Sequence, residues 1–249
     1  MTGPNVTDAP RTPPQRFLHE GPDSYWSNPR TDLLELVERF TPATRRRRAL
    51  DVGCANGVFA QSLFSLGFDE VWGVEPDAAC AKLAAAVLTG VVEGPFPHAD
   101  AADHGPYDLI VFGDSLEHIE DPWQALGTAR ALLGADGVLV LSVPNVAHHA
   151  VLLPAIRGRW EYAQAGLLDR RHLRFFTPRS LAAAVKDAGL APVFERRTCP
   201  LPHGRAKRAL AQAARLVAPH LVTAKVDLVC RADAPPAPRG WPLTYSYPA

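Results

Sequence analysis

The chain has 249 residues, and its 26 basic residues balance its 26 acidic ones, so no net field attracts nucleic acid or an anionic membrane. This length suits one domain with a substantial core. The four cysteines are scattered without a Cys-x-x-Cys pair, which argues against a zinc site or a disulfide framework and favours a reducing cytoplasm. No apolar run is long enough to span a bilayer, and residues 1–15 contain prolines where a signal peptide needs an apolar segment.

The first half of the chain predicts helices that alternate with strands. Residues 1–22 are rich in Pro, Thr and Gly and predict a flexible arm. Apolar residues at helical spacing predict a helix over residues 31–40. Tyr25 and Trp26 before it either pack against the domain or form part of a lid over the sheet. Arg45 to Arg48 favour a solvated strand entrance over contact with nucleic acid. Strands are expected at residues 49–52, 70–74 and 90–93, and helices at 58–66 and 77–88.

The second half continues the alternation but contains one long interruption. Strands are expected at residues 109–112, 138–143, 192–197 and 225–231, and helices at 122–133, 178–188 and 205–217. Residues 145–176 show no clear period, and an irregular segment of this length favours a functional loop over a simple connection. Residues 234–249 carry several prolines and predict an extended tail. The main domain therefore spans residues 23–233, with an active-site insertion at 145–176.

The most informative stretch is the glycine-bearing turn Asp51-Val-Gly-Cys-Ala-Asn-Gly57, which follows the first strand. Gly53 and Gly57 allow positive φ angles and let a ligand approach the backbone closely. Glu75 ends the next strand, about 20 residues further on, where a carboxylate can accept two ribose hydroxyls. This order of strand, turn, helix and acidic strand end is typical of the nucleotide-binding half of a doubly wound sheet. The chain is therefore expected to bind a cofactor that contains a nucleoside.

Three sequence blocks together resemble one family. The turn from Asp51 to Gly57 resembles the first motif of class I S-adenosylmethionine-dependent methyltransferases, with Ala55 where that family usually has its middle glycine. Tyr107-Asp-Leu-Ile-Val-Phe-Gly-Asp-Ser-Leu-Glu-His-Ile-Glu-Asp-Pro-Trp123 resembles the fourth-strand motif of the branch with Leu-Glu-His after the strand. Gly166-Leu-Leu-Asp-Arg-Arg-His-Leu-Arg-Phe-Phe-Thr177 resembles a motif of small bacterial members of that branch. The resemblance covers roughly residues 32–232.

The resemblance implies a fold and a cofactor. The fold is α/β, a Rossmann-like seven-stranded sheet of order 3-2-1-4-5-7-6 with strand 7 antiparallel and helices on both faces. The cofactor is S-adenosylmethionine. The family often has an Asp after the third strand that meets the adenine amino group, but Pro95 stands there in this chain. The adenine is therefore expected to stack on Phe96, with Asp100 ranked above Asp103 as a substitute acceptor. The expected cofactor-binding residues are Asp51, Gly53, Ala55, Gly57, Glu75, Phe96, Asp114 and Ser115.

Two histidines are the candidate catalytic residues. Methyl transfer from a sulfonium mainly requires alignment of the acceptor and exclusion of water, and a base matters only if the acceptor loses a proton. His118 either serves as that base or orders its loop through a hydrogen bond. His172 either acts as a base or belongs to a rim of arginines, which in turn either binds an anionic acceptor or pairs internally with Asp169. The expected acceptor-binding residues are Asn145, Trp160, Tyr162 and Arg171.

The function expected from these features is transfer of a methyl group to O or N of a small-molecule acceptor, such as a secondary metabolite or a sugar-like compound. The alternatives are an NAD(P)-dependent oxidoreductase on the same sheet and a non-catalytic, cofactor-binding scaffold protein. No metal is expected, since the reaction needs none and the adjacent His148 and His149 favour a loop surface. A cytoplasmic monomer or homodimer without nucleic-acid or membrane partners is expected.

Overall fold

The computed structural model describes residues 29–199, 212–214 and 216–232. Three expected features therefore lie outside the described residues: the arm at 1–22, the aromatic pair Tyr25 and Trp26, and the tail at 234–249. The helix expected at 205–217 lies mostly outside them as well. Among the described residues, no helix is both long enough and apolar enough to cross a membrane.

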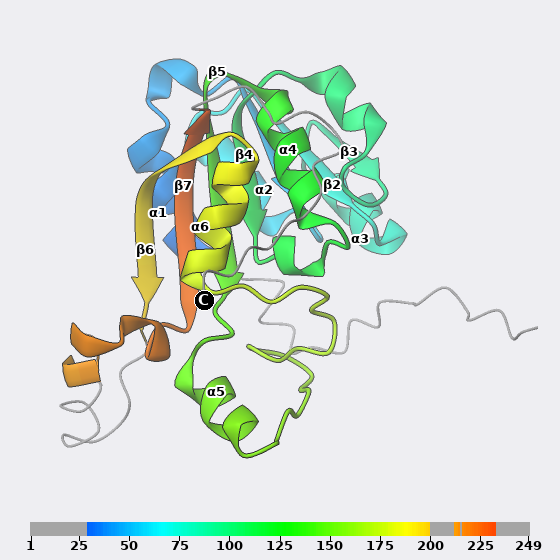
Figure 1. The fold of residues 1–249 in the computed structure, drawn as a ribbon. Coiled ribbons are helices and arrows are strands. Elements are labelled where there is room, and N and C mark those ends of the chain that lie inside the picture. The colour runs from blue at the N-terminus through cyan, green and yellow to red at the C-terminus, as the bar shows by residue number, and fades with distance from the viewer. Residues whose placement is uncertain (1–28, 200–211, 215, 233–249) are drawn as a thin grey trace, which may run out of the picture.

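A seven-stranded sheet forms the centre of the molecule (Figure 1). Its order is β3-β2-β1-β4-β5-β7-β6, as expected. Strands β1 to β5 pair in parallel, whereas β7 runs antiparallel to both β5 and β6. The strands are β1 Arg48–Val52, β2 Glu70–Glu75, β3 Gly90–Glu93, β4 Tyr107–Gly113, β5 Leu133–Pro144, β6 Leu190–Thr198 and β7 Lys225–Ala232.

Helices cover both faces of this sheet. Two of them begin with strong caps: the Asp121 side chain accepts the Gln124 N–H before α4, and Thr177 forms a capping box with Ser180 before α6. In each case a proline at the first helical position supplies a preset φ angle. The helices are α1 Thr31–Phe40, α2 Val58–Ser65, α3 Ala78–Ala84, α4 Pro122–Leu132, α5 His149–Ile156 and α6 Pro178–Asp187.

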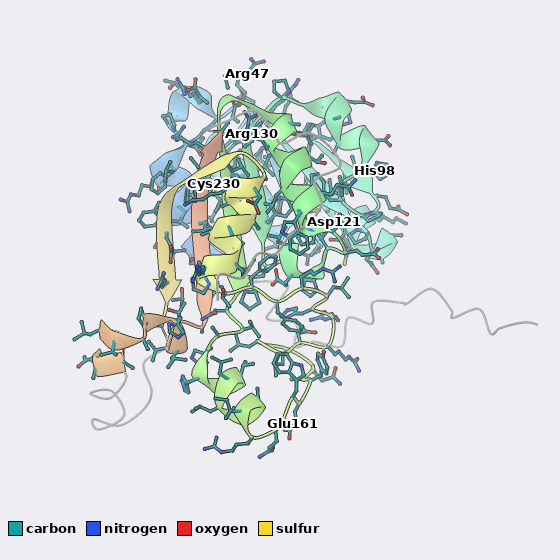
Figure 2. All side chains as sticks on the ribbon, in the orientation of Figure 1. Arg47, His98, Asp121, Arg130, Glu161 and Cys230 are labelled. Carbon is teal, nitrogen blue, oxygen red and sulfur yellow. The ribbon has the colours of Figure 1, made fainter. Side chains whose placement is uncertain are left out.

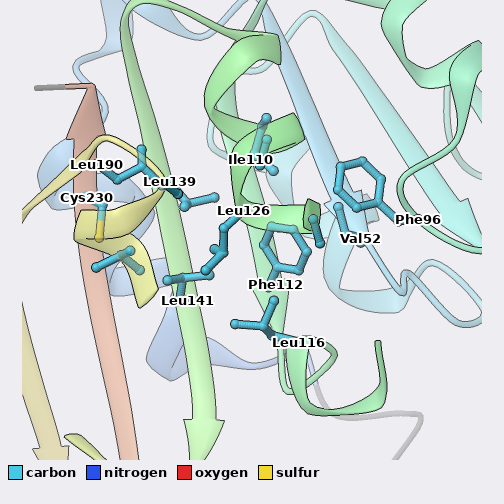
Figure 3. Close-up of a cluster of buried hydrophobic side chains, with 14 of the residues drawn as sticks. Val52, Phe96, Ile110, Phe112, Leu116, Leu126, Leu139, Leu141, Leu190 and Cys230 are labelled. Carbon is cyan, nitrogen blue, oxygen red and sulfur yellow. The ribbon is translucent and has the colours of Figure 1, made fainter. Parts of the chain in front are cut away.

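Two hydrophobic clusters hold the layers together. The first joins α4 and α6 to the sheet, and Leu126 of α4 lies against Phe112 and Leu141 in it (Figure 3). The second lies on the opposite face, where Leu33 of α1 and Leu63 of α2 are fully buried. The central strands are thus buried on both sides, which explains their nearly continuous apolar sequence.

The segment 145–176 differs from its expected irregular form because it contains α5. This helix has no amphipathic period in its sequence, includes Pro154, and buries only Val151. A bridge between Asn145 and Phe176 closes the base of the segment. The segment stands beyond the carboxyl end of β5 (Figure 1), and Glu161 lies at its outer end, away from the sheet (Figure 2). Helix α3 is also shorter than expected and ends at Ala84 rather than near residue 88.

Candidate active site

The turn between β1 and α2 has the left-handed backbone that its glycines allow. The φ angles are 76° at Gly53, 49° at Ala55 and 85° at Gly57. A Cβ atom on Gly53 would lie 2.8 Å from the Cβ of Ser115, so a side chain is excluded there by space as well as by conformation. Ala55 adopts a conformation that a glycine reaches more easily, and its N–H is fixed by a hydrogen bond to the Oε2 atom of Glu75, at 2.8 Å.

Glu75 ends β2 and connects two backbone segments. Its Oε1 atom accepts the N–H of Asp77 at 2.9 Å, while Oε2 accepts the N–H of Ala55. The side chain is buried, yet each carboxylate oxygen has a second lone pair for a further donor. The residue thus holds the turn in place and keeps the capacity to accept ribose hydroxyls.

Asp51 is a second buried carboxyl group beneath the same turn. Burial, with a smaller contribution from the charge of Glu75, raises the pKa of Asp51 to about 7, and the charge of Arg30 acts in the opposite direction. Asp51 and Arg30 line a cavity of about 120 Å³, together with Gly53, Ala55 and Gly113. This cavity lies at the carboxyl ends of β1 and β4, where open α/β sheets bind their ligands.

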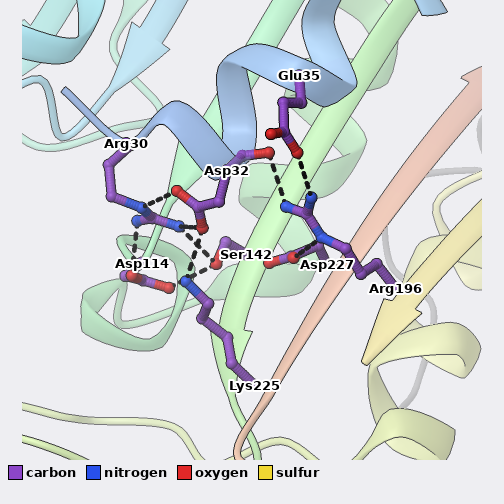
Figure 4. Close-up of polar contacts among 8 residues, drawn as sticks. All are labelled: Arg30, Asp32, Glu35, Asp114, Ser142, Arg196, Lys225 and Asp227. Atoms are coloured by element: carbon purple, nitrogen blue, oxygen red, sulfur yellow. Dashed lines mark hydrogen bonds and ion pairs between the residues drawn. The ribbon is translucent and has the colours of Figure 1, made fainter. Parts of the chain in front are cut away.

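Arg30 is a site residue that sequence reasoning missed. It lines the cavity and has a left-handed φ of 50° just before α1. Its guanidinium donates to Asp32, to Asp114 at 2.7 Å and to Ser142 at 3.1 Å (Figure 4). Asp114 and Ser142 lie 84 and 112 residues away in the sequence, so no local pattern marks the position.

The carboxyl end of β4 places two of the expected cofactor-binding residues beside the glycine turn. Asp114 has a φ of 60°, and its two oxygens accept hydrogen bonds from Arg30 and from the hydroxyl of Ser142, both at 2.7 Å. The hydroxyl of Ser115 is buried next to Gly53 and has no hydrogen-bond partner among the described residues. A buried hydroxyl without a partner next to a glycine turn is suited to a polar ligand.

Beyond Ser115 the chain brings together Glu117, His118 and His172. The backbone carbonyl of Glu117 accepts the N–H groups of Leu173 and Arg174 at 2.9 and 3.0 Å, which fixes the third sequence block against the end of β4. The two imidazole rings lie 4.9 Å apart, centre to centre. The Nε2 atom of His172 is 3.9 Å from the Oε1 atom of Glu117.

Burial controls the charge of this group of side chains. The carboxyl group of Glu117 is only 1% exposed, and burial, followed by the charge of Asp114, raises its pKa well above the usual range. Burial also lowers the pKa of both imidazoles, and in His118 the neighbouring His172 lowers the pKa further. The histidines are therefore held in the neutral form that can accept a proton.

The four expected acceptor-binding residues fall into different environments. Asn145 is fully buried, and its amide group makes three hydrogen bonds, to the carbonyls of His220 and Thr223 and from the N–H of Ala147, so it fastens the base of the insertion. Arg171 pairs with Asp169 at 2.6 Å, the internal pairing weighed from the sequence. Trp160 and Tyr162 are 42% and 59% exposed on the insertion, so they remain candidates to contact an acceptor.

Phe96 lies in the hydrophobic core rather than at the cavity. Its ring is 5% exposed and meets Phe112 edge-on, with 5.7 Å between the centroids. Stacking of adenine on this ring stays a prediction, as does the expected absence of a metal.

The residues of the turn fit S-adenosylmethionine. Gly53 leaves space that a Cβ atom would fill. The Glu75 carboxylate can accept hydrogen bonds, and the buried hydroxyl of Ser115 has no partner among the described residues. Arg30 also lines the cavity, where its guanidinium is already paired with Asp32 and Asp114.

Comparisons with known proteins identify the family. A family model described as a methyltransferase domain matches residues 25–194. A ubiquinone biosynthesis O-methyltransferase of Bordetella avium is 28% identical over 167 residues, which are 64% of this chain and 68% of that protein. One from Cereibacter sphaeroides is 28% identical over 155 residues, 59% of this chain and 61% of that protein. The chain thus spans about two thirds, or slightly less, of these relatives.

Solved structures share the fold. A SAM-dependent methyltransferase from Archaeoglobus fulgidus is 17% identical, with a TM-score of 0.54, over 80% of this chain and 93% of that one. An S-adenosylmethionine-dependent methyltransferase from Mesorhizobium loti is 20% identical, with a TM-score of 0.52, over 79% of this chain and 96% of that one. The family match decides against the oxidoreductase alternative. The chain belongs to the family of methyltransferase domains, and it is a class I methyltransferase that depends on S-adenosylmethionine.

Proposed function

We propose that this enzyme methylates an oxygen atom of a small hydroxylated acceptor, such as a secondary metabolite or a sugar-like compound, that binds beside the 145–176 insertion. The O-methyltransferase names of the relatives favour oxygen over nitrogen. The exposed Trp160 and Tyr162 on the insertion supply flat apolar surfaces for an organic acceptor.

The cofactor end of the site would bind S-adenosylmethionine through four groups. Gly53 and Gly57 admit the cofactor to the backbone, and Glu75 accepts the ribose hydroxyls. Arg30, which already pairs with Asp32 and Asp114, lines the cavity beside the bound cofactor, and the Ser115 hydroxyl gains the partner that it lacks among the described residues.

The acceptor end would hold the hydroxyl and receive its proton. The bound cofactor supplies an already activated methyl group, so the protein aligns the acceptor and excludes water. The Nδ1 atoms of His118 and His172 lie 3.1 and 3.4 Å from backbone carbonyls, and a proton on Nδ1 leaves the lone pair on Nε2. Either Nε2 atom can take the acceptor proton during attack.

One observation carries this proposal. Residues 113–118 form a continuous segment that lines the cofactor cavity at Gly113, lies against Gly53 at Ser115 and presents an imidazole at His118. The same short segment would therefore contact the cofactor, which carries the methyl group, and present the imidazole that accepts the proton of the acceptor.

A methyl-transfer assay with labelled S-adenosylmethionine, run on panels of phenols, sugars and amines, tests the proposal. A hydroxylated compound should be methylated on oxygen. His172→Ala should lower turnover while the affinity for S-adenosylhomocysteine stays within about threefold, which is below 1 kcal/mol.

His118→Ala is measured in parallel. His149→Ala is the matched control, because its imidazole lies in the same insertion but contacts the carbonyl of Leu221. Full turnover by both His172→Ala and His118→Ala would remove the histidines from proton transfer. Methylation of amines alone would contradict the choice of oxygen.

A further inference from the structure

We propose that Glu117, His118 and His172 bind one divalent first-row transition metal ion, of the Zn²⁺, Co²⁺ or Mn²⁺ type. Their ligand atoms all lie within 4.8 Å of one another, a grouping that no short sequence motif shows because His172 follows His118 by 54 positions. The inference concerns metal binding itself and does not depend on the identity of the acceptor. With the ion bound, both imidazoles would be ligands, so a histidine could accept the acceptor proton only in the metal-free protein.

The donor set is the first step of the argument. Two imidazole nitrogens and one carboxylate oxygen are preferred ligands of zinc and of neighbouring transition metals, and they suit Mg²⁺ or Ca²⁺ poorly. A zinc ion about 2.1 Å from each ligand separates adjacent ligand atoms by roughly 3 to 3.5 Å. The observed 3.9 Å between His172 Nε2 and Glu117 Oε1 needs only a small side-chain adjustment to reach that range.

The orientation of the imidazoles is the second step. The His118 Nδ1 atom faces the carbonyl oxygen of Arg171 at 3.1 Å, and the His172 Nδ1 atom faces that of Leu167 at 3.4 Å. Metal-binding histidines characteristically donate one ring N–H to a backbone carbonyl or carboxylate, which fixes the tautomer and presents the other nitrogen to the metal. Both histidines have this arrangement, with the carbonyls supplied by the third sequence block.

The carboxyl group of Glu117 is the third and independent step. It is 1% exposed, and its Oε2 atom is buried without a hydrogen-bond partner among the residues described. A buried carboxyl oxygen without a partner is costly. A cation bound by both oxygens of the carboxylate and by the two imidazoles would give Oε2 a partner and would use both ring nitrogens.

Three protein ligands leave at least one coordination position open. Metal sites with three protein ligands usually keep that position for water or a bound reactant. The cluster follows Ser115, which lies beside the cofactor turn, so the open position would lie on the acceptor side of the site. The neighbouring Arg171 pairs with Asp169, so its positive charge is balanced by that carboxylate.

Metal titration of the full chain tests the site. The protein is treated with a chelator, freed of it, and titrated with Zn²⁺ by calorimetry and with Co²⁺ by visible absorption. We expect one ion per chain and cobalt bands typical of four or five ligands. Glu117→Gln and His172→Ala should each weaken binding by at least about 100-fold, since even the partners of metal ligands contribute about 10- to 100-fold.

His149→Ala is the matched control and should bind the metal like the unmodified chain. S-adenosylhomocysteine binding by each variant shows that the fold persists, and anomalous diffraction from crystals of the unmodified chain grown with Zn²⁺ locates the ion without any substitution. Absence of stoichiometric binding, equal binding by His172→Ala, or an anomalous peak elsewhere, such as at His148 and His149, would overturn the proposal.

Discussion

At the scale of single residues, Glu75 shows how one side chain serves both the fold and the ligand. Its oxygens accept the N–H groups of Ala55 and Asp77, so it fixes the position of the turn relative to β2. Acceptance of the ribose hydroxyls by the same carboxylate stays a prediction. A substitution that removes the whole carboxyl group would lose both backbone hydrogen bonds, whereas Gln keeps one accepting oxygen and so disturbs the turn less.

Glu75→Gln should weaken the binding of S-adenosylhomocysteine by about 1.5 to 3 kcal/mol, the range for hydrogen bonds to charged groups, or roughly 10- to 150-fold. Calorimetric titration measures the affinity. Glu93→Gln is the matched control, because Glu93 is the register partner of Glu75 on β3 and is exposed. Unchanged affinity in a folded Glu75→Gln variant would show that the ribose binds elsewhere.

At the scale of elements, the 145–176 insertion has a fixed base and an exposed outer part. Asn145 and Val146 bond through their N–H groups to Ala224 and Phe176, which ties both ends of the segment to the domain. Leu173 and Arg174 bond to the carbonyl of Glu117. Farther out, Ile156 and Tyr162 are 81% and 59% exposed. Few buried contacts of this kind accompany low local stability.

Hydrogen exchange should therefore divide the insertion in two. Amides 157–165 should exchange fast in the protein alone, while those of Val146, Leu173 and Arg174 stay protected. Addition of both S-adenosylhomocysteine and an acceptor should slow exchange at 157–165, because in the proposed function the acceptor binds beside this part of the insertion. Helix α2 provides the internal reference. Identical exchange at 157–165 with and without the ligands would contradict a covering role.

A helix or strand can be predicted from the sequence when its own residues carry a clear apolar period. The strands and α1 could be predicted because their apolar periods arise from burial on one or two faces. Helix α5 could not, since it buries only Val151 and contains Pro154, so its helix depends on its setting at the base of the insertion. Helix α3 ends earlier than its Ala-rich sequence indicated, because Gly90 already begins β3 and the chain needs a short connection.

At the scale of the whole molecule, the sheet fixes a buried carboxyl group, Asp51, in its centre. The pKa of Asp51 is raised from 3.8 to about 7, so the folded protein binds a proton that the unfolded chain has already lost. The contribution of Asp51 to the free energy of unfolding should therefore fall as the pH rises from about 4 to about 7, and it should then level off.

Asp51→Asn should remove this contribution and make the protein more stable than the unmodified chain at pH 8, by up to about 4 kcal/mol at 1.36 kcal/mol for each pKa unit. The difference should shrink toward pH 4. Urea unfolding at both pH values measures it, with the exposed Asp103→Asn as control for the loss of a charge. An equal difference at both pH values would argue against titration of Asp51.

The candidate site could be predicted from the sequence only where its residues belong to local motifs. Gly53 and Glu75 follow from a strand, a turn and a spacing, and they were identified. Arg30 was missed because two of its partners are distant in sequence: Asp114 follows β4 and Ser142 lies in β5. The grouping of Glu117 with His172 was missed for the same reason, since only the folded insertion brings the third block against the end of β4.

The ion pairs around α1 also determine when this helix becomes fully stabilised during synthesis. Asp32 pairs with Lys225 at 3.0 Å across 193 positions, and the Arg196 guanidinium reaches both the carbonyl of Asp32 and the carboxylate of Asp227 (Figure 4). Translation therefore produces α1 first but supplies these partners last. Until β6 and β7 have emerged from the ribosome, this helix lacks its C-terminal anchors, so a nascent chain stalled before residue 196 should expose it to chaperones and proteases.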